Sequence, residues 1–122
     1  MKIKSVMIVD DSEGDQLLTK LTIEEFDPDI SISQAYDGRE ALGILGPQYC
    51  PDIIFLDINM PGMGGHEFLE EYSQLEQSST VILMLSSSYQ EIDKQKSLQY
   101  DFVKRYVEKP VVLDLLKEFS EA

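Results

Sequence analysis

The chain has 122 residues, the usual size of one domain. Its 23 Asp and Glu outnumber 10 Lys and Arg, and the net charge of −13 disfavours direct binding to nucleic acids or anionic membranes. The single cysteine excludes an internal disulfide, and no apolar run approaches the roughly 20 residues of a membrane span. Without a signal-peptide cleavage site near the start, the composition predicts one acidic, cytoplasmic domain.

Short apolar segments recur along the chain at lengths that suit strands. The predicted strands cover residues 6–9, 30–35, 53–56, 81–85 and 102–107. Four of them are apolar without alternation, which is typical of parallel strands covered on both faces. The second alternates and is therefore expected at an edge of the sheet.

Helical periodicity fills the segments between and after the strands. The predicted helices cover residues 13–26, 41–45, 68–75, 90–99 and 112–119. In the first helix, Leu17, Leu18 and Leu21 are expected to face the core as one apolar stripe. The fourth has only Ile92 and Leu98 as strongly apolar residues, so it is expected to be loosely anchored.

Five successive strand–helix units predict the fold class. They indicate an α/β protein with a doubly wound parallel sheet and helices on both faces. A closed barrel of eight such units needs about 250 residues and is excluded by the length. No linker or internal repeat interrupts the chain, so one domain over residues 1–122 is expected.

Polar residues stand where the predicted strands end. Asp10 and Asp11 follow the first strand, Asp57 the third, residues 86–88 (three serines) the fourth, and Lys109 the fifth. Each alone is typical of a turn or a helix cap. Because ligands of open α/β sheets bind outside the carboxyl ends of the strands, the combination predicts one functional site.

The chemistry of these side chains indicates phosphoryl transfer. Three converging carboxylates repel one another unless a cation neutralises them, and ligands that are all oxygen suit Mg²⁺. An aspartate can act as the nucleophile on phosphorus, while a metal, a lysine and a serine hydroxyl share the phosphoryl oxygens. Asp57 is the best candidate nucleophile because it ends the most apolar strand, and Asp10 and Asp11 would then hold the metal.

These segments resemble the receiver domain of bacterial two-component response regulators. The matching segments are Val9-Asp10-Asp11, residues 57–65 (DINMPGMGG), Leu85-Ser86 and Lys109-Pro110. The match covers essentially the whole chain. It implies a flavodoxin-like (βα)5 fold with strand order 2-1-3-4-5, and a receiver domain over residues 1–122 without an output domain.

The resemblance implies a phosphoacceptor and a metal site. Asp57 would accept the phosphoryl group. Asp11, Asp57 and the backbone carbonyl of Asn59 would bind Mg²⁺, with Asp10 acting mainly through water. The only chemistry implied for the chain itself is Mg²⁺-dependent self-phosphorylation and autodephosphorylation, so it is not expected to be a conventional enzyme.

The resemblance also implies a switch. Lys109 would contact the phosphoryl group, Ser86 would be the hydroxyl that moves toward it, and Tyr106 would be the aromatic side chain that turns inward with it. The sequence leaves Ser87 open as an alternative hydroxyl. The peptide bond before Pro110 is expected to be cis.

The implied partners are proteins. A sensor histidine kinase or a histidine phosphotransfer protein would supply the phosphoryl group, and an unidentified protein would recognise the altered surface. The fourth helix, the fifth strand and the fifth helix are expected to form that surface. The chain would be a monomer or a phosphorylation-dependent dimer, and it would bind neither nucleic acid nor membrane.

Three other functions are compatible with parts of this pattern. A phosphohydrolase of the haloacid dehalogenase type needs a second acid two residues after the nucleophile, where this chain has Asn59. A flavin-binding electron carrier would not place Asp10 and Asp11 in its phosphate loop. A binding scaffold that is never phosphorylated would not need the complete set of acids, hydroxyl and lysine.

Two single residues have simpler interpretations. His66 is the only histidine and is expected to lie at the surface or to cap a helix. Cys50 is expected to be a buried or half-buried, inert thiol.

Overall fold

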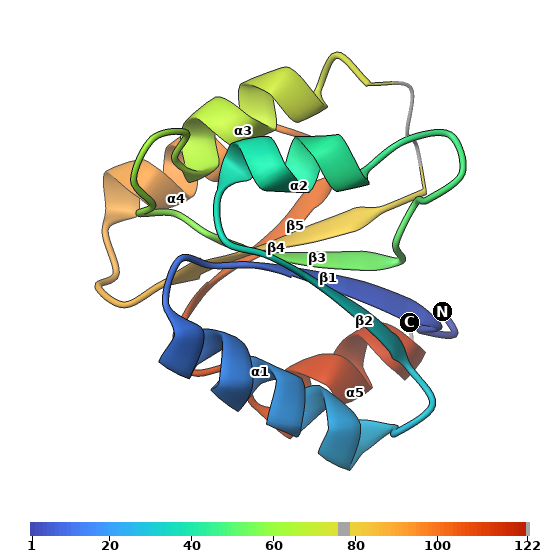
Figure 1. Cartoon of the computed structure of the whole chain (residues 1–122). Helices are drawn as coiled ribbons and strands as arrows, with labels where there is room; N and C mark the ends of the chain where they lie inside the picture. The colour runs from blue at the N-terminus through green and yellow to red at the C-terminus, as the bar shows by residue number, and fades with distance from the viewer. Residues whose placement is uncertain (76–78, 122) are drawn as a thin grey trace.

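The computed structural model describes residues 1–75 and 79–121, which form a five-stranded sheet with helices on both faces (Figure 1). The elements are β1 (Ser5–Val9), α1 (Glu13–Phe26), β2 (Ser31–Ala35), α2 (Gly38–Ile44), β3 (Ile53–Asp57), α3 (Gly65–Tyr72), β4 (Val81–Ser86), α4 (Glu91–Leu98), β5 (Val103–Glu108) and α5 (Leu113–Glu121). All neighbouring strands are parallel and their order is β2-β1-β3-β4-β5. The predicted doubly wound sheet with strand order 2-1-3-4-5 is therefore confirmed.

The sheet separates two layers of apolar core. In Figure 1, α1 and α5 cover one face of the sheet, and α2, α3 and α4 cover the other. Ile54 and Leu56 of β3 belong to the layer under α2 and α3, whereas Ile53 and Phe55 belong to the layer under α1 and α5. This split follows from the alternation of side chains along a strand. β3 is the central strand, and all five of its residues are buried. β2 lies at an edge of the sheet, as predicted.

The orientation of α1 differs from the prediction. Leu17, Leu18 and Leu21 are 54%, 55% and 52% exposed, so the expected apolar stripe faces away from the core. The buried side is formed by Gln16, Thr19 and Ile23.

A buried amide explains this orientation. The Gln16 Nε2 group donates hydrogen bonds to the carbonyl oxygens of Ile8, Asp10 and Ala35 at 3.1, 3.1 and 2.8 Å. These carbonyls lie at the ends of β1 and β2, and a leucine in place of Gln16 would leave them without this donor.

The α4 helix is anchored as weakly as the sequence predicts. Ser97 is its only buried residue, and Ile92 and Leu98 are exposed. The predicted burial of the apolar residues in the third and fifth helices is confirmed for Phe68, Leu69, Tyr72, Leu116 and Phe119. Leu75 and Val112 are exposed because each lies outside the helix to which it was assigned. None of the helices described is long and apolar enough to cross a membrane.

Candidate functional site

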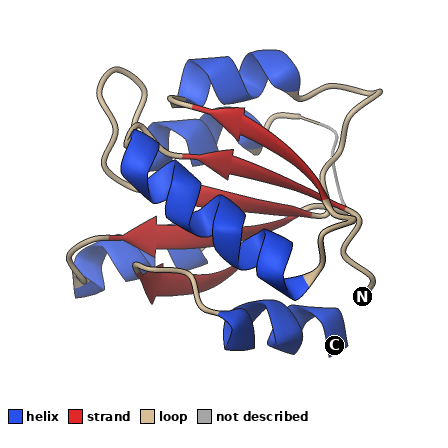
Figure 2. Ribbon diagram, turned by 60° about the horizontal axis from the view of Figure 1, so that its bottom comes forward, coloured by secondary structure: helices blue, strands red, loops and turns tan. Residues whose placement is uncertain are grey.

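The candidate site lies at the carboxyl edge of the sheet, where Figure 2 shows the arrowheads of the strands together. Asp10 follows β1, and Asp57 is the last residue of the adjacent strand β3. β2 lies on one side of β1 and β3 on the other, so the direction in which strands are added to the sheet reverses at β1. Ligands of open α/β sheets bind at such a point. Both carboxylates are buried, whereas Asp11 is exposed.

Three carboxylates converge at this edge. One oxygen from each of Asp10, Asp11 and Asp57 lies within 4.8 Å of the others. Asp10 Oδ1 accepts a hydrogen bond from the Ser12 backbone N–H at 2.9 Å, so the first turn of the following helix fixes its orientation. Asp11 makes no hydrogen bond or ion pair within the described part of the chain and is free to bind a ligand.

Lys109 provides the positive charge of the site. It directly follows β5, and its Nζ lies 2.8 Å from Asp10 Oδ2, 2.9 Å from Asp15 Oδ2 and 3.4 Å from Asp57 Oδ1. The peptide bond between Lys109 and Pro110 is cis, as predicted. The cluster therefore has four carboxylates around one ammonium group and carries excess negative charge.

Asp15 is a member of the cluster that the sequence reasoning missed. It lies in the first turn of α1, whose N-cap Ser12 directly follows Asp11. An acid in the first turn of a helix that begins at the acid cluster is the signal in the sequence that could have identified it. Its partner Lys109 is 94 residues away, so only the fold shows the contact.

Burial and charge change the acidity of the buried groups. Burial, followed by the negative charge of Asp10, raises the pKa of Asp57 from 3.8 to about 6, although Lys109 and the Asn59 backbone N–H act in the opposite direction. Burial lowers the pKa of Lys109, but its hydrogen bonds to Asp10 and Asp15 more than offset this and leave the pKa above its usual value. Lys109 is thus a permanent cation, and Asp57 is a carboxylate at neutral pH with increased basicity.

Gly65 brings the start of α3 close to the end of β3. A Cβ atom at Gly65 would lie 2.8 Å from the carbonyl oxygen of Asp57 and 2.8 Å from Ile58 Cα. The Gly65 N–H also donates a hydrogen bond to the Ile58 carbonyl at 3.0 Å. Only glycine allows this approach, so this glycine of the Asp57 segment serves packing of α3 against the end of β3.

Ser86, the predicted switch hydroxyl, lies beside Lys109, whose backbone N–H donates to the Ser86 carbonyl at 2.8 Å. Ser86 is the buried last residue of β4, whereas Ser87 is exposed. The Ser86 hydroxyl donates to the carbonyl oxygen of Ser88 at 2.5 Å and accepts from the Ser88 backbone N–H at 3.1 Å. In this structure the Ser86 hydroxyl is therefore engaged by the loop that leads to α4.

Tyr106 is already inside the protein while Ser86 bonds to Ser88. Its side chain belongs to the buried core, and its hydroxyl has no hydrogen-bond partner among the described residues. The exposed ring of Tyr89 packs edge-on against it, with ring centroids 5.4 Å apart. Packing by Tyr89 and by its neighbour in the sheet, Met84, holds the ring inward.

The donor set fits Mg²⁺. The carboxylates supply only oxygen, two of them are buried, and the third is free and exposed to solvent. Mg²⁺ is bound by one or two carboxylates together with waters and phosphate oxygens, which this mixture of buried and exposed acids allows. Asn59, whose backbone carbonyl is the further ligand implied by the resemblance, is exposed two residues after Asp57.

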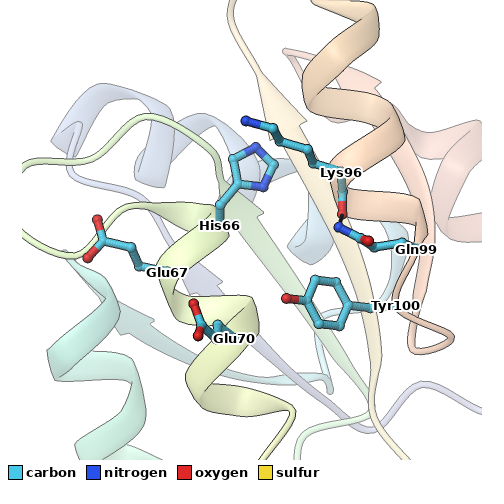
Figure 3. A pocket seen from close by; sticks show the side chains of 6 residues that line it. All are labelled: His66, Glu67, Glu70, Lys96, Gln99 and Tyr100. Carbon is cyan, nitrogen blue, oxygen red and sulfur yellow. Dashed lines mark hydrogen bonds between the residues drawn. The ribbon is translucent and has the colours of Figure 1, made fainter.

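A hollow of about 260 Å³ between α3 and α4 is a second concave feature. Figure 3 shows side chains of α3 on one side, and Lys96, Gln99 and Tyr100 on the other. His66 reaches across it, and its Nε2 lies 3.3 Å from Asp93 Oδ1. The histidine is therefore partly exposed, as predicted, but it contacts the next helix instead of capping its own.

Cys50 is exposed, so the prediction of a buried or half-buried thiol is wrong. The loop before β3 turns at Gly46, and the Cys50 thiol donates to the Gly46 carbonyl at 3.6 Å on the surface. The hairpin-like bridge between Gly46 and Tyr49 sets this geometry, which the sequence alone did not reveal.

Comparison with known proteins establishes the family. Residues 6–120 match the model of the response regulator receiver domain. The chain is 30% identical over 120 residues to sporulation initiation phosphotransferase F of Bacillus subtilis, covering 97% of this chain and 91% of that protein. It is 38% identical over 98 residues to a protein-glutamate methylesterase/protein-glutamine glutaminase of Methanospirillum hungatei, covering 80% of this chain but only 26% of that longer protein.

A solved structure agrees with this assignment. The crystal structure of a two component response regulator from Cytophaga hutchinsonii superimposes with a TM-score of 0.90 at 30% identity, covering 99% of this chain and 96% of that one. The chain belongs to the family of response regulator receiver domains. This homology supports a phosphorylation-dependent signalling switch of the two-component type.

Proposed function

We propose that Asp57 accepts a phosphoryl group from a phosphohistidine of a sensor histidine kinase or a histidine phosphotransfer protein. The observation that carries this proposal is a basic, buried carboxylate at the end of the central strand, 3.4 Å from a lysine ammonium and beside two further acids. Raised basicity makes a carboxylate a better nucleophile at neutral pH.

The transfer is a single substitution at phosphorus. An oxygen of Asp57 attacks the phosphorus, and the new O–P bond forms as the N–P bond to the donor imidazole breaks. The imidazole nitrogen keeps the electron pair of the broken bond and takes up a proton. Lys109 stabilises the charge on the phosphoryl oxygens, which is the main requirement of such a reaction.

Asp10, Asp11, Asp57 and the backbone carbonyl of Asn59 would hold Mg²⁺, directly or through water. When bound, Mg²⁺ supplies positive charge that offsets the carboxylates and the phosphoryl oxygens. Asp10 also orients Lys109 through their 2.8 Å contact. The chemistry of the chain is then limited to self-phosphorylation and autodephosphorylation, and no separate substrate is turned over.

Labelling with a small phosphodonor tests the phosphoacceptor. With acetyl phosphate and Mg²⁺, the wild-type chain is expected to gain the mass of one phosphoryl group, and Asp57→Asn to gain none, because an amide cannot form the acyl phosphate. Asp101→Asn, at an exposed aspartate outside the cluster, serves as the control and should label like the wild type. Labelling of Asp57→Asn would show that another residue is the acceptor. A wild-type chain that gains nothing from several donors would instead support the binding scaffold.

The exposed leucines of α1 supply the docking face for the donor. Leu17 and Leu21 are one helical turn apart, and Leu18 lies beside them, so the three side chains form one apolar surface. The helix begins directly after Asp10 and Asp11, so this surface lies on the element that leads away from the acid cluster. Such an apolar surface bordered by charge is typical of a protein interaction site.

Replacing one of these leucines separates docking from chemistry. Leu18→Ser is expected to slow transfer from a histidine-phosphorylated protein at least about five-fold, because an apolar contact is lost from the interface. The rate with acetyl phosphate should not change. Leu75→Ser, at an exposed leucine beyond the C-terminal end of α3, is the control. Equal slowing with both donors would contradict a docking role.

We further propose that phosphorylation acts through Ser86. Its hydroxyl would leave the Ser88 carbonyl for a phosphoryl oxygen, which releases the loop before the weakly anchored α4 helix. The surface of α4, β5 and α5 would then be read by the downstream protein. Tyr106, packed under Tyr89, would respond to the movement of this loop.

Removal of the Ser86 hydroxyl is expected to uncouple the switch. Ser86→Ala should still be phosphorylated, but the change in hydrogen exchange over residues 86–98 on phosphorylation should fall by at least half. Ser87→Ala is the matched control, since that serine is exposed. A normal response in Ser86→Ala with a lost response in Ser87→Ala would transfer the role to Ser87.

A further inference from the structure

We infer that Asp15 is a positioning residue that holds Lys109 away from Asp57, so that the Lys109–Asp15 ion pair opposes loading of the phosphoryl site. This inference rests on the proposed function of Asp57 and Lys109. It concerns a carboxylate outside the residues that the family motifs identify, and it assigns that carboxylate an effect on the phosphorylation equilibrium.

The distances show which partners hold the lysine. Lys109 Nζ lies 2.9 Å from Asp15 Oδ2 and 2.8 Å from Asp10 Oδ2, but 3.4 Å from the phosphoacceptor Asp57. The two shorter contacts have the length of charge-assisted hydrogen bonds, and the longer one does not. The ammonium is thus bound mainly by the two acids that do not carry the phosphoryl group.

The start of α1 fixes the position of Asp15. Its backbone N–H donates to the Ser12 side chain, which caps the helix, at 3.2 Å. The next residue, Gln16, is buried and donates to three backbone carbonyls, so this turn cannot shift easily. Asp15 therefore presents its carboxylate to Lys109 from a rigid support.

The exposure of Asp10 and Asp15 determines which of their contacts with Lys109 is broken more easily. Two of the three N–H donors of the ammonium group face Asp10 and Asp15, and the third remains for a phosphoryl oxygen on Asp57. Movement of the ammonium group toward that oxygen would lengthen one of the two shorter contacts. The Asp10 side chain is 1% exposed and would lose its charge partner without gaining water, whereas the Asp15 side chain is 38% exposed and can be hydrated. Breaking the Asp15 contact is the less costly change.

Both effects of Asp15 oppose phosphorylation. It holds the ammonium group of Lys109 away from Asp57, and it adds negative charge beside an anionic ligand. Removal of this carboxylate should therefore favour the loaded state. Since a partly exposed ion pair contributes modestly, the expected gain in affinity is about two- to five-fold.

Beryllofluoride, which stands for the phosphoryl group on Asp57, provides the test. Its affinity would be measured with Mg²⁺ for the wild type, Asp15→Asn and Asp15→Ala, at low and at high salt. Glu13→Gln is the matched control: it removes the same charge from the same helical turn, and Glu13 makes no ion pair in the described part of the chain. Unfolding without ligand would be measured in parallel.

The expected result is tighter beryllofluoride binding in both Asp15 variants than in Glu13→Gln, with a difference that persists at high salt. A merely structural role would lower the free energy of unfolding without improving affinity. Asp15 variants that bind like Glu13→Gln, or more weakly than the wild type, would overturn this inference alone. A wild-type chain that binds no beryllofluoride would overturn the proposed function and this inference with it.

Discussion

Asp57→Asn is expected to raise the free energy of unfolding at pH 8 by up to about 3 kcal/mol. The wild-type fold holds this carboxylate with a pKa of about 6 instead of 3.8, chiefly because of burial and then because of Asp10. A difference of this size corresponds to about 3 kcal/mol between the ionised and the neutral side chain. The amide has the shape of the neutral acid and avoids this cost.

The sign of the effect sets its pH dependence. The folded wild type binds the Asp57 proton more tightly than the unfolded chain, so its stability increases as the pH falls from about 6 toward 3.8. Asparagine does not titrate. The advantage of Asp57→Asn should therefore be full above about pH 7, decrease between about pH 6 and 4, and vanish below that range.

Urea unfolding from pH 8 to pH 4, in the presence of a chelator, measures this difference. Asp11→Asn is the control because Asp11 is exposed, and its stability should stay within about 0.5 kcal/mol of the wild type. An increase in the stability of Asp57→Asn that is independent of pH, or a decrease in its stability at pH 8, would contradict the prediction that the ionised Asp57 carboxylate destabilises the fold. A carboxylate held at this cost is consistent with selection for chemistry at this position rather than for stability.

Lys109→Met is expected to destabilise the fold by about 3 kcal/mol at neutral pH without divalent cations. Its side chain is the one cation that contacts the buried carboxylates of Asp10 and Asp57 in the described part of the chain, and methionine leaves both without it. Loss of one partner of a buried ion pair has a cost of this size because the remaining charge is not compensated. The loss should diminish at low pH, where the carboxylates are protonated.

Mg²⁺ should recover part of this lost stability. The variant is expected to show a larger increase in melting temperature on adding Mg²⁺ than the wild type, since more negative charge is available to neutralise. Lys104→Met removes an exposed lysine of β5 and is the control, with little change expected in either condition. Equal stability of Lys109→Met and wild type would show that the cluster does not depend on this cation.

Most of the fold could be predicted from local patterns. The continuously apolar residues 53–56 indicate burial on both faces, and the alternating residues 30–35 indicate an edge strand. These predictions are possible because the pattern of apolar residues in a strand depends on which of its faces are buried. The acids at strand ends predict one site because parallel strands bring their carboxyl ends to one edge. The strand order itself came from the family resemblance carried by Asp57, Lys109 and their neighbours.

Contacts between distant segments could not be predicted. The ion pair of Asp15 with Lys109 and the contact of His66 with Asp93 join side chains that no local period relates. Cys50 lies on the surface because of a turn in its loop. Each depends on how packed elements place side chains relative to one another.

The α1 helix illustrates the difference between local sequence patterns and contacts formed on folding. Local patterns were enough to predict that a helix follows Asp10 and Asp11 and that an acidic site lies at its start. Which side of this helix faces the sheet depends on contacts with the strand ends, which become visible in the folded protein. The Gln16 side-chain amide donates to backbone carbonyls at the ends of β1 and β2, including that of Ala35, which also accepts from the Asp10 N–H. Because Gln16 forms these hydrogen bonds from the buried side of the helix, Leu17, Leu18 and Leu21 face outward.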